Sequence, residues 1–113
     1  MIGVAYVLPD DALARVFQRL YAWAAPGSLL ALTGFAAGSD IVGMQDVLDL
    51  YQRMGAQLYP RPSTELLRLA GPWQPYQGGL QPFETYAEAT LGTKIVPDLF
   101  RTNVGYGGIL FHP

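Results

Sequence analysis

Two apolar segments flank an amphipathic one in the first third of the chain. Residues 2–8, IGVAYVL, and residues 29–35, LLALTGF, are nearly continuous apolar runs, as is typical of strands buried on both faces. Between them, apolar side chains recur at helical spacing over residues 12–25, and Pro26-Gly27 ends that helix. A strand–helix–strand order predicts a crossover that joins two parallel strands of one sheet, and therefore an α/β chain.

The remaining pattern predicts more helices and then strands. Asp10 or Asp11 is expected to cap the first helix, a second helix is predicted over residues 41–55, and Ser63 is expected to cap a short third helix, TELLRLA. Residues 73–89 predict an edge strand or an irregular hairpin, because Gly and Pro interrupt them. We expect a loop over residues 92–103 and a closing strand in VGYGGILFHP.

The composition limits both size and surface. A chain of 113 residues predicts one domain, and we expect residues 1–113 to form a single partial domain. Half of the residues are hydrophobic and 14% are charged, whereas about 25% is usual in soluble domains. This shortage of charge predicts a partner or an uncovered apolar face.

Several classes of function are excluded or disfavoured by the residue types. The chain has no cysteine, which excludes disulfides, zinc-thiolate sites and a cysteine nucleophile, and no metal site is predicted. A net charge of −2 with scattered arginines does not favour nucleic-acid binding. The apolar start is too short to span a bilayer and lacks the basic residues of a signal peptide, so no membrane contact and a cytoplasmic location are expected.

Five segments together resemble one family. They are VAYVLPD (4–10), AAPGSLLALT (24–33), RPSTELLRLA (61–70), QGGLQP (77–82) and YGGILFHP (106–113). In this order and spacing they resemble the C-terminal half of class I S-adenosylmethionine-dependent methyltransferases. The chain is most similar to a bacterial family of S-adenosyl methyltransferases first catalogued as a domain of unknown function.

The resemblance implies a fold and an activity. In such a sheet, of order 3-2-1-4-5-7-6, this chain would supply a partial Rossmann-like sheet with strands in the order 4-5-7-6. Strands 4 and 5 would be parallel, helices would lie on the faces, and the C-terminal strand would be antiparallel. The implied reaction is methyl transfer from S-adenosylmethionine to a small-molecule acceptor. The glycine-rich cofactor loop after strand 1 lies outside this sequence, so the isolated chain is expected to be inactive.

Candidate cofactor-binding residues lie at the end of the first predicted strand. Tyr6, Val7 and Leu8 would line the crevice at the carboxyl ends of the strands, where open α/β sheets bind ligands. Alternatively, they form a strand end packed under a helix. The family tends to have histidine where this chain has Tyr6, so a base mechanism does not transfer, and no catalytic residue is predicted.

Candidate substrate-binding residues follow the second predicted strand and continue in aromatic positions. Thr33 and Phe35 are placed where an acceptor could approach, and Tyr59 and Trp73 could form an aromatic wall. Alternatively, Thr33 and Phe35 only mark the end of the strand, and Tyr59 and Trp73 only pack against their neighbours. His112, the only histidine, is expected in an exposed tail next to the C-terminus.

Two functions from different classes remain open. In the first, the chain is half of a methyltransferase and needs an N-terminal half, encoded in the same gene or in a separate one. In the second, it is a non-catalytic interaction or ligand-binding module that forms a homodimer through its exposed first strand.

Overall fold

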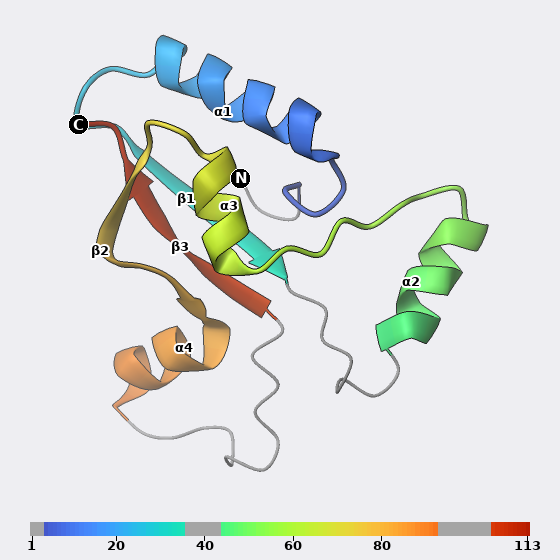
Figure 1. The fold of residues 1–113 in the computed structure, drawn as a ribbon. Coiled ribbons are helices and arrows are strands. Elements are labelled where there is room, and N and C mark those ends of the chain that lie inside the picture. The colour runs from blue at the N-terminus through green and yellow to red at the C-terminus, as the bar shows by residue number, and fades with distance from the viewer. Residues whose placement is uncertain (1–3, 36–43, 93–104) are drawn as a thin grey trace.

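The computed structural model describes residues 4–35, 44–92 and 105–113. Along the chain, the helices and strands in these ranges are α1 (Asp10–Trp23), β1 (Leu29–Phe35), α2 (Met44–Arg53), α3 (Ser63–Leu69), β2 (Gln74–Pro82), α4 (Phe83–Leu91) and β3 (Gly105–Phe111) (Figure 1). The chain is therefore α/β, as its sequence pattern predicts.

The three described strands form one antiparallel sheet in the order β1-β3-β2. The C-terminal strand β3 thus lies between the other two, and the prediction of an antiparallel C-terminal strand is confirmed. β1 and β3 pair without interruption from Leu29 opposite Phe111 to Phe35 opposite Gly105. None of the three strands carries a charged residue.

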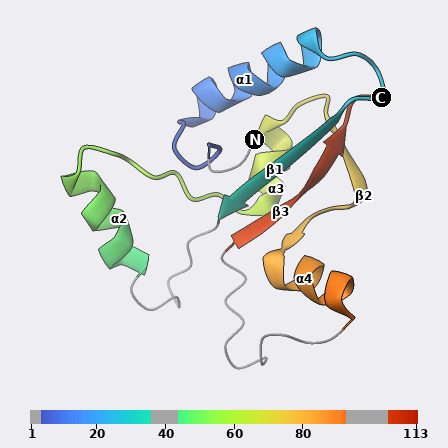
Figure 2. The same cartoon turned by 180° about the vertical axis from the view of Figure 1, so that it is seen from behind.

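Helices α1 and α3 cover one face of this sheet. Leu13 and Phe17 of α1 are fully buried against Leu32 of β1 and Leu110 of β3, and Leu66 of α3 joins the same core. Figure 2 shows the opposite side, where β1 and β3 lie in front with no described helix across them. Apolar residues remain exposed on that side, with Leu29 57% and Ile109 36% exposed.

The predicted first strand is not formed over residues 4–8, which make a turn instead. The Val7 amide donates to the Val4 carbonyl at 3.1 Å, and the Tyr59 amide donates to the Tyr6 carbonyl at 2.7 Å. The carbonyls of Ala5 and Leu8 accept from a buried arginine at 2.6 Å each. Because these groups bond to a distant loop, they do not build a strand ladder. The expected parallel pair is therefore not present among the described strands.

The two predicted caps are also corrected. Pro9 and Pro62 occupy the cap positions of α1 and α3, both extended, and neither helix has a side-chain cap bond. Asp10 and Ser63 instead begin their helices. Proline favours this boundary because its fixed φ suits the start of a helix.

Helix α4 replaces part of the predicted irregular strand. Residues 74–82 do form an edge strand, with a register break between Tyr76 and Gln81. Phe83–Leu91 is helical, and Gly92 ends the helix in the left-handed conformation at φ 72°. The aromatic residues favoured a strand, but the bounding Pro82 and Gly92 are typical helix boundaries.

Helix α2 confirms the second predicted helix. Its Val47 and Tyr51 side chains are 44% and 40% exposed. Residues 41–43 of that prediction, and most of the predicted loop 92–103, lie outside the described residues.

His112 does not lie in an exposed tail, as the sequence predicted, because its ring stacks on Tyr21 with centroids 3.7 Å apart. No described helix is long and apolar enough to cross a bilayer.

Candidate functional site

Three of the predicted site residues meet at the carboxyl end of β1. The rings of Tyr6 and Phe35 contact edge to face, with centroids 5.1 Å apart. The backbone bond from Tyr59 to Tyr6 brings the third aromatic residue to the same place. These residues come from the turn before α1, from β1 and from the loop before α3. Open α/β sheets bind ligands at this end of their strands, so the aromatic cluster is a candidate site.

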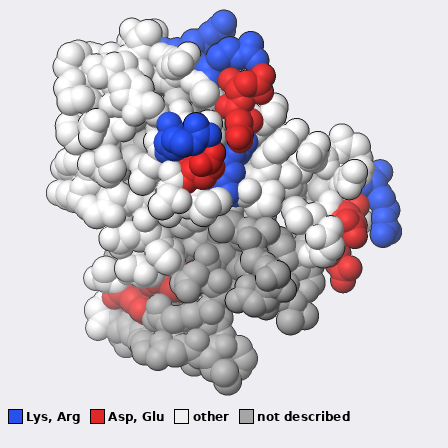
Figure 3. All heavy atoms as spheres, in the orientation of Figure 1, with Lys and Arg blue, Asp and Glu red and all other residues white. Residues whose placement is uncertain are grey.

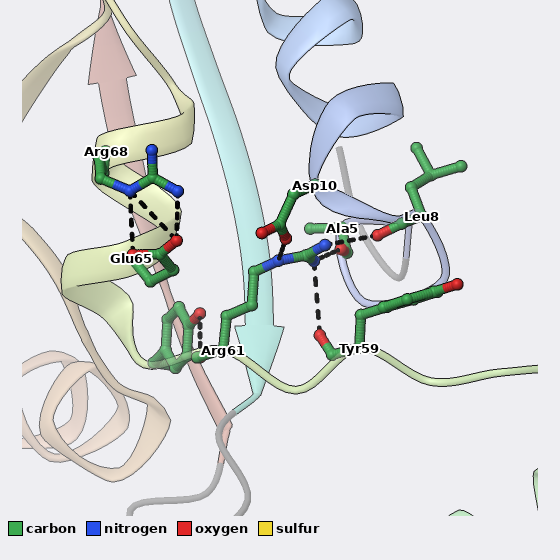
Figure 4. Close-up of polar contacts among 8 residues, drawn as sticks. Ala5, Leu8, Asp10, Tyr59, Arg61, Glu65 and Arg68 are labelled. Atoms are coloured by element: carbon green, nitrogen blue, oxygen red, sulfur yellow. Dashed lines mark hydrogen bonds and ion pairs between the residues drawn. The ribbon is translucent and has the colours of Figure 1, made fainter.

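Arg61 holds these three segments together (Figure 4). Its side chain donates to the Asp10 carboxylate at 2.8 Å and to the Ala5 and Leu8 carbonyls at 2.6 Å each. A longer bond of 3.4 Å reaches the Tyr59 carbonyl. Its backbone amide donates to the Phe35 carbonyl at 2.9 Å. One residue thus fixes residues 4–8 against the end of β1.

The charge of Arg61 is buried but compensated. The residue is 5% exposed, whereas the Asp10 side chain that it pairs with is 59% exposed. Inside the protein, backbone carbonyl oxygens accept the other hydrogen bonds of the guanidinium. These bonds replace the ones that it would make to water, so the buried cation stays compensated. The Asp10 carboxylate connects the buried cation to solvent at the start of α1.

Tyr106 of β3 packs beneath this arginine. Its hydroxyl donates to the Arg61 carbonyl at 2.7 Å. Burial raises the pKa of the Tyr106 phenol to about 12, and the Arg61 cation opposes part of this rise. The ring fills the space above Gly34, where a Cβ would come within 2.7 Å of it. The phenol is therefore neutral at physiological pH and acts as a packed donor.

The interior of the cluster is too tight for a ligand. Eight residues, among them Tyr6, Phe35, Tyr59 and Arg61, surround a space that has no room for a water molecule. Ligand pockets usually measure about 300–1,000 Å³. A ligand would therefore contact the outer surface of the cluster, where Val7 is 44% exposed.

The candidate cofactor residues fit only part of a nucleoside site. Tyr6 and Val7 offer aromatic and aliphatic surface, which suits the face of an adenine ring. Leu8 packs toward the core and its carbonyl is bonded to Arg61. The carboxylate tied to this cluster, Asp10, is held by Arg61 through one oxygen, so the described residues supply one wall of such a site.

The other two predicted substrate residues are placed differently. Thr33 lies in β1 opposite Gly107, two residues before Phe35 and half-buried. Trp73 lies away from the cluster, in the core, 4% exposed, and its indole donates to the Phe17 carbonyl at 3.1 Å. It packs against the residues at the other end of β1, so the structure does not bring it together with Tyr59.

The sequence analysis did not identify Arg61 as a site residue. A signal was present, because Arg61 stands between Pro60 and Pro62 in a rigid extended segment. Such a segment presents its side chain in a fixed direction, which suits a buried anchor. The partners, however, lie more than 50 residues away in the sequence, at Ala5, Leu8 and Asp10.

Comparison with known proteins gives matches in structure alone. No family model matches the sequence, and no curated protein matches it. A DUF574 family protein from Streptomyces avermitilis MA-4680 matches 100% of this chain and 43% of its own, with 18% identity and a TM-score of 0.77. A "putative methyltransferase" from Thermobifida fusca YX matches 97% of this chain and 41% of its own, with 20% identity and a TM-score of 0.69.

These similarities concern the fold and its extent. The chain spans less than half the length of either of these two proteins. The fold is methyltransferase-like, and the resemblance that the sequence motifs indicated is confirmed at that level.

Proposed function

We propose that this chain is the C-terminal half of a class I S-adenosylmethionine-dependent methyltransferase unit. In this proposal β1, β3 and β2 take the places of strands 5, 7 and 6, and the chain leading into residues 4–8 takes that of strand 4. The observation that carries it is the match of the entire chain, at a TM-score of 0.77, to less than half of a larger protein. The order β1-β3-β2 supports the assignment, since it equals 5-7-6.

The aromatic cluster would serve as one wall of the reaction site. Tyr6 and Val7, with Leu8 behind them, would lie against the cofactor, and Thr33, Phe35 and Tyr59 would face the methyl acceptor. Methyl transfer depends mainly on aligning the sulfonium methyl with the attacking atom, so a rigid wall contributes by positioning. Arg61 would keep the wall in place through its bonds to Ala5 and Leu8.

The other wall would come from a completing N-terminal half, in the same polypeptide or in a separate one, acting in the cytoplasm. We therefore expect no tight binding of S-adenosylmethionine to the purified 113-residue chain by titration calorimetry. Micromolar binding would show that the second half is not needed. The intact mass of the natural protein from its own cell identifies whether the half is covalently joined.

The wall itself is tested in the completed protein. Tyr6→Ala should weaken binding of S-adenosylmethionine about tenfold, as the loss of one aromatic contact predicts. Tyr51→Ala is the matched control, because Tyr51 is 40% exposed on α2. Equal affinities for the two variants would remove Tyr6 from the cofactor site.

The homodimer remains a second proposal, with a narrower basis. Residues 4–8 do not offer a strand edge, so a dimer through them would need a rearrangement of the Arg61 bonds. A monomer by analytical ultracentrifugation at micromolar concentration would exclude it.

A further inference from the structure

Helix α2 lies apart from the sheet and from the other helices (Figures 1 and 2). Among the described elements, none packs extensively against it, and none of its described residues joins the core. Helices shorter than about 12–15 residues are only marginally stable in water, and most of their stability in proteins comes from packing an apolar face. Because α2 has 10 residues, we expect a partner to cover it.

One face of α2 is apolar and open to water. Four large side chains at the spacing i, i+3, i+4 and i+7 form a stripe along it, the α2 stripe: Val47, Leu50, Tyr51 and Met54. The Met54 amide donates to the Leu50 carbonyl at 3.1 Å, so Met54 continues the helical turn. Each of the four side chains is at least 40% exposed. The stripe is therefore an uncovered surface of the size of one short helix.

Two opposite charges border the α2 stripe. Asp46 lies in the first turn of α2 and Arg53 in the last. They are seven residues apart, which is close to two helical turns, so both lie on the same flank of the stripe. Neither forms an ion pair within the described parts of the chain. Figure 3 shows the charged side chains of α2 at one edge of the molecule, away from those of α1 and α3.

A second copy of α2 in antiparallel orientation matches both the stripe and the charges. If a two-fold axis passes between residues 50 and 51, Leu50 lies opposite Tyr51 of the second copy, and apolar residues meet along the whole stripe. Asp46 then lies about 3 Å along the helix axis from Arg53 of the second copy, within reach of that side chain. The antiparallel helix dipoles also attract each other. A parallel pair would place the charged flank beside the uncharged one and form no such ion pairs.

We propose that α2 is a self-association surface, at which two copies of this chain pair in antiparallel orientation through the α2 stripe. This inference goes beyond the proposed function and does not depend on it. It also differs from a dimer through residues 4–8, because the two surfaces share no residue. Four side chains from each copy bury less than the roughly 1,200 Å² of a stable complex. The dimer is therefore weak, with mostly monomer at about 10 µM and a growing dimer fraction toward about 1 mM.

Sedimentation equilibrium of the 113-residue chain over this concentration range measures the association. Asp46→Arg and Arg53→Asp each bring like charges together across the pair, so each variant alone should remain monomeric. An equal mixture of the two should associate about as strongly as the unchanged chain, because opposite charges then face each other again. An effect of the charges on the helix alone would not be reversed by mixing. Circular dichroism verifies that both variants fold.

A leucine substitution tests the apolar part of the surface. Leu50→Asp should abolish the association, because it places a charge in the stripe of each copy. Leu91→Asp is the matched control, since Leu91 is an exposed leucine of α4, 63% exposed, and this variant should associate like the unchanged chain.

Disulfide cross-linking tests the direction of the pair. The chain has no cysteine, so Val47→Cys and Met54→Cys each introduce a single thiol. An antiparallel pair places these two positions opposite each other, and a mixture of the variants should form the mixed disulfide. Val47→Cys alone should form little disulfide, because its two thiols lie about seven residues apart along the helices.

Four results would overturn the proposal. They are a chain that remains monomeric at about 1 mM, a mixture of the two charge variants that does not associate, an association that survives Leu50→Asp, and a disulfide that forms as readily from Val47→Cys alone as from the mixture. Binding of S-adenosylmethionine enters none of these measurements, so failure of this surface and failure of the proposed function are distinguishable.

Discussion

Replacing Arg61 by methionine should be among the most destabilising single changes in this chain. Methionine keeps much of the aliphatic stem but removes the cation, leaving the Ala5 and Leu8 carbonyls without their 2.6 Å donors. Each buried acceptor left unsatisfied costs about 1–3 kcal/mol. Asp10 adds little, because its side chain is 59% exposed and water can take the place of Arg61. The expected loss is therefore about 4 kcal/mol, the middle of the range for two such acceptors.

Urea unfolding followed by circular dichroism measures this loss. A domain of this size unfolds with a slope of about 1–3 kcal/mol per molar urea, so the midpoint should fall by about 2 M. Arg68→Met is the matched control, because Arg68 is 64% exposed and pairs with Glu65 one helical turn away. An exposed pair of this kind contributes only about 0–1 kcal/mol.

Arg61→Lys keeps the experiment decisive if the methionine variant does not fold. Lysine keeps the charge but cannot reach several separated acceptors with one planar group, so an intermediate loss is expected. The reasoning is refuted if Arg61→Met and Arg68→Met lower the midpoint equally. It is also refuted if Arg61→Lys is as stable as the unchanged chain.

Three further predictions follow from the packing. Gly34→Ala should destabilise the fold by about 1–3 kcal/mol, because its Cβ would lie 2.7 Å from the Tyr106 ring. Tyr106→Leu should reduce this loss of stability when the urea midpoints are compared in a double-mutant cycle. Trp73→Ala should cost about 3–5 kcal/mol in the same assay, whereas Trp23→Ala should change stability little, because the two side chains differ in exposure at 4% and 86%. Burial raises the pKa of Tyr106 from 10.0 to about 12. The stability that the protonated phenol contributes is therefore complete below pH 10 and is lost as the pH rises through about 12. Tyr106→Phe should lack this part of the fall in urea midpoint at alkaline pH.

Local pattern was sufficient to predict most of the helices and, at least in part, each of the three described strands. The buried face of α1, with Leu13 and Phe17, follows directly from the helical spacing of apolar residues. The strands at 29–35 and 105–111 follow from apolar runs bounded by glycine and proline. These elements were predictable because each one's own residues decide its form.

Residues 4–8 show where local pattern fails. Their apolar run is as strand-like as that of β1, but a strand needs a partner for its backbone groups, and residues 4–8 pair with none of the described strands. The guanidinium of Arg61 and the amide of Tyr59 take the carbonyls instead. Both lie more than 50 residues away, so no window of sequence around residues 4–8 contains the cause.

The candidate site was predictable only in its location. The rule that ligands bind at the carboxyl ends of strands correctly brought Tyr6 and Phe35 together. Trp73 was grouped with them only because it is aromatic, and its place depends on packing against Phe17 and Tyr21 of α1. Residue type alone does not distinguish a core tryptophan from one that lines a site.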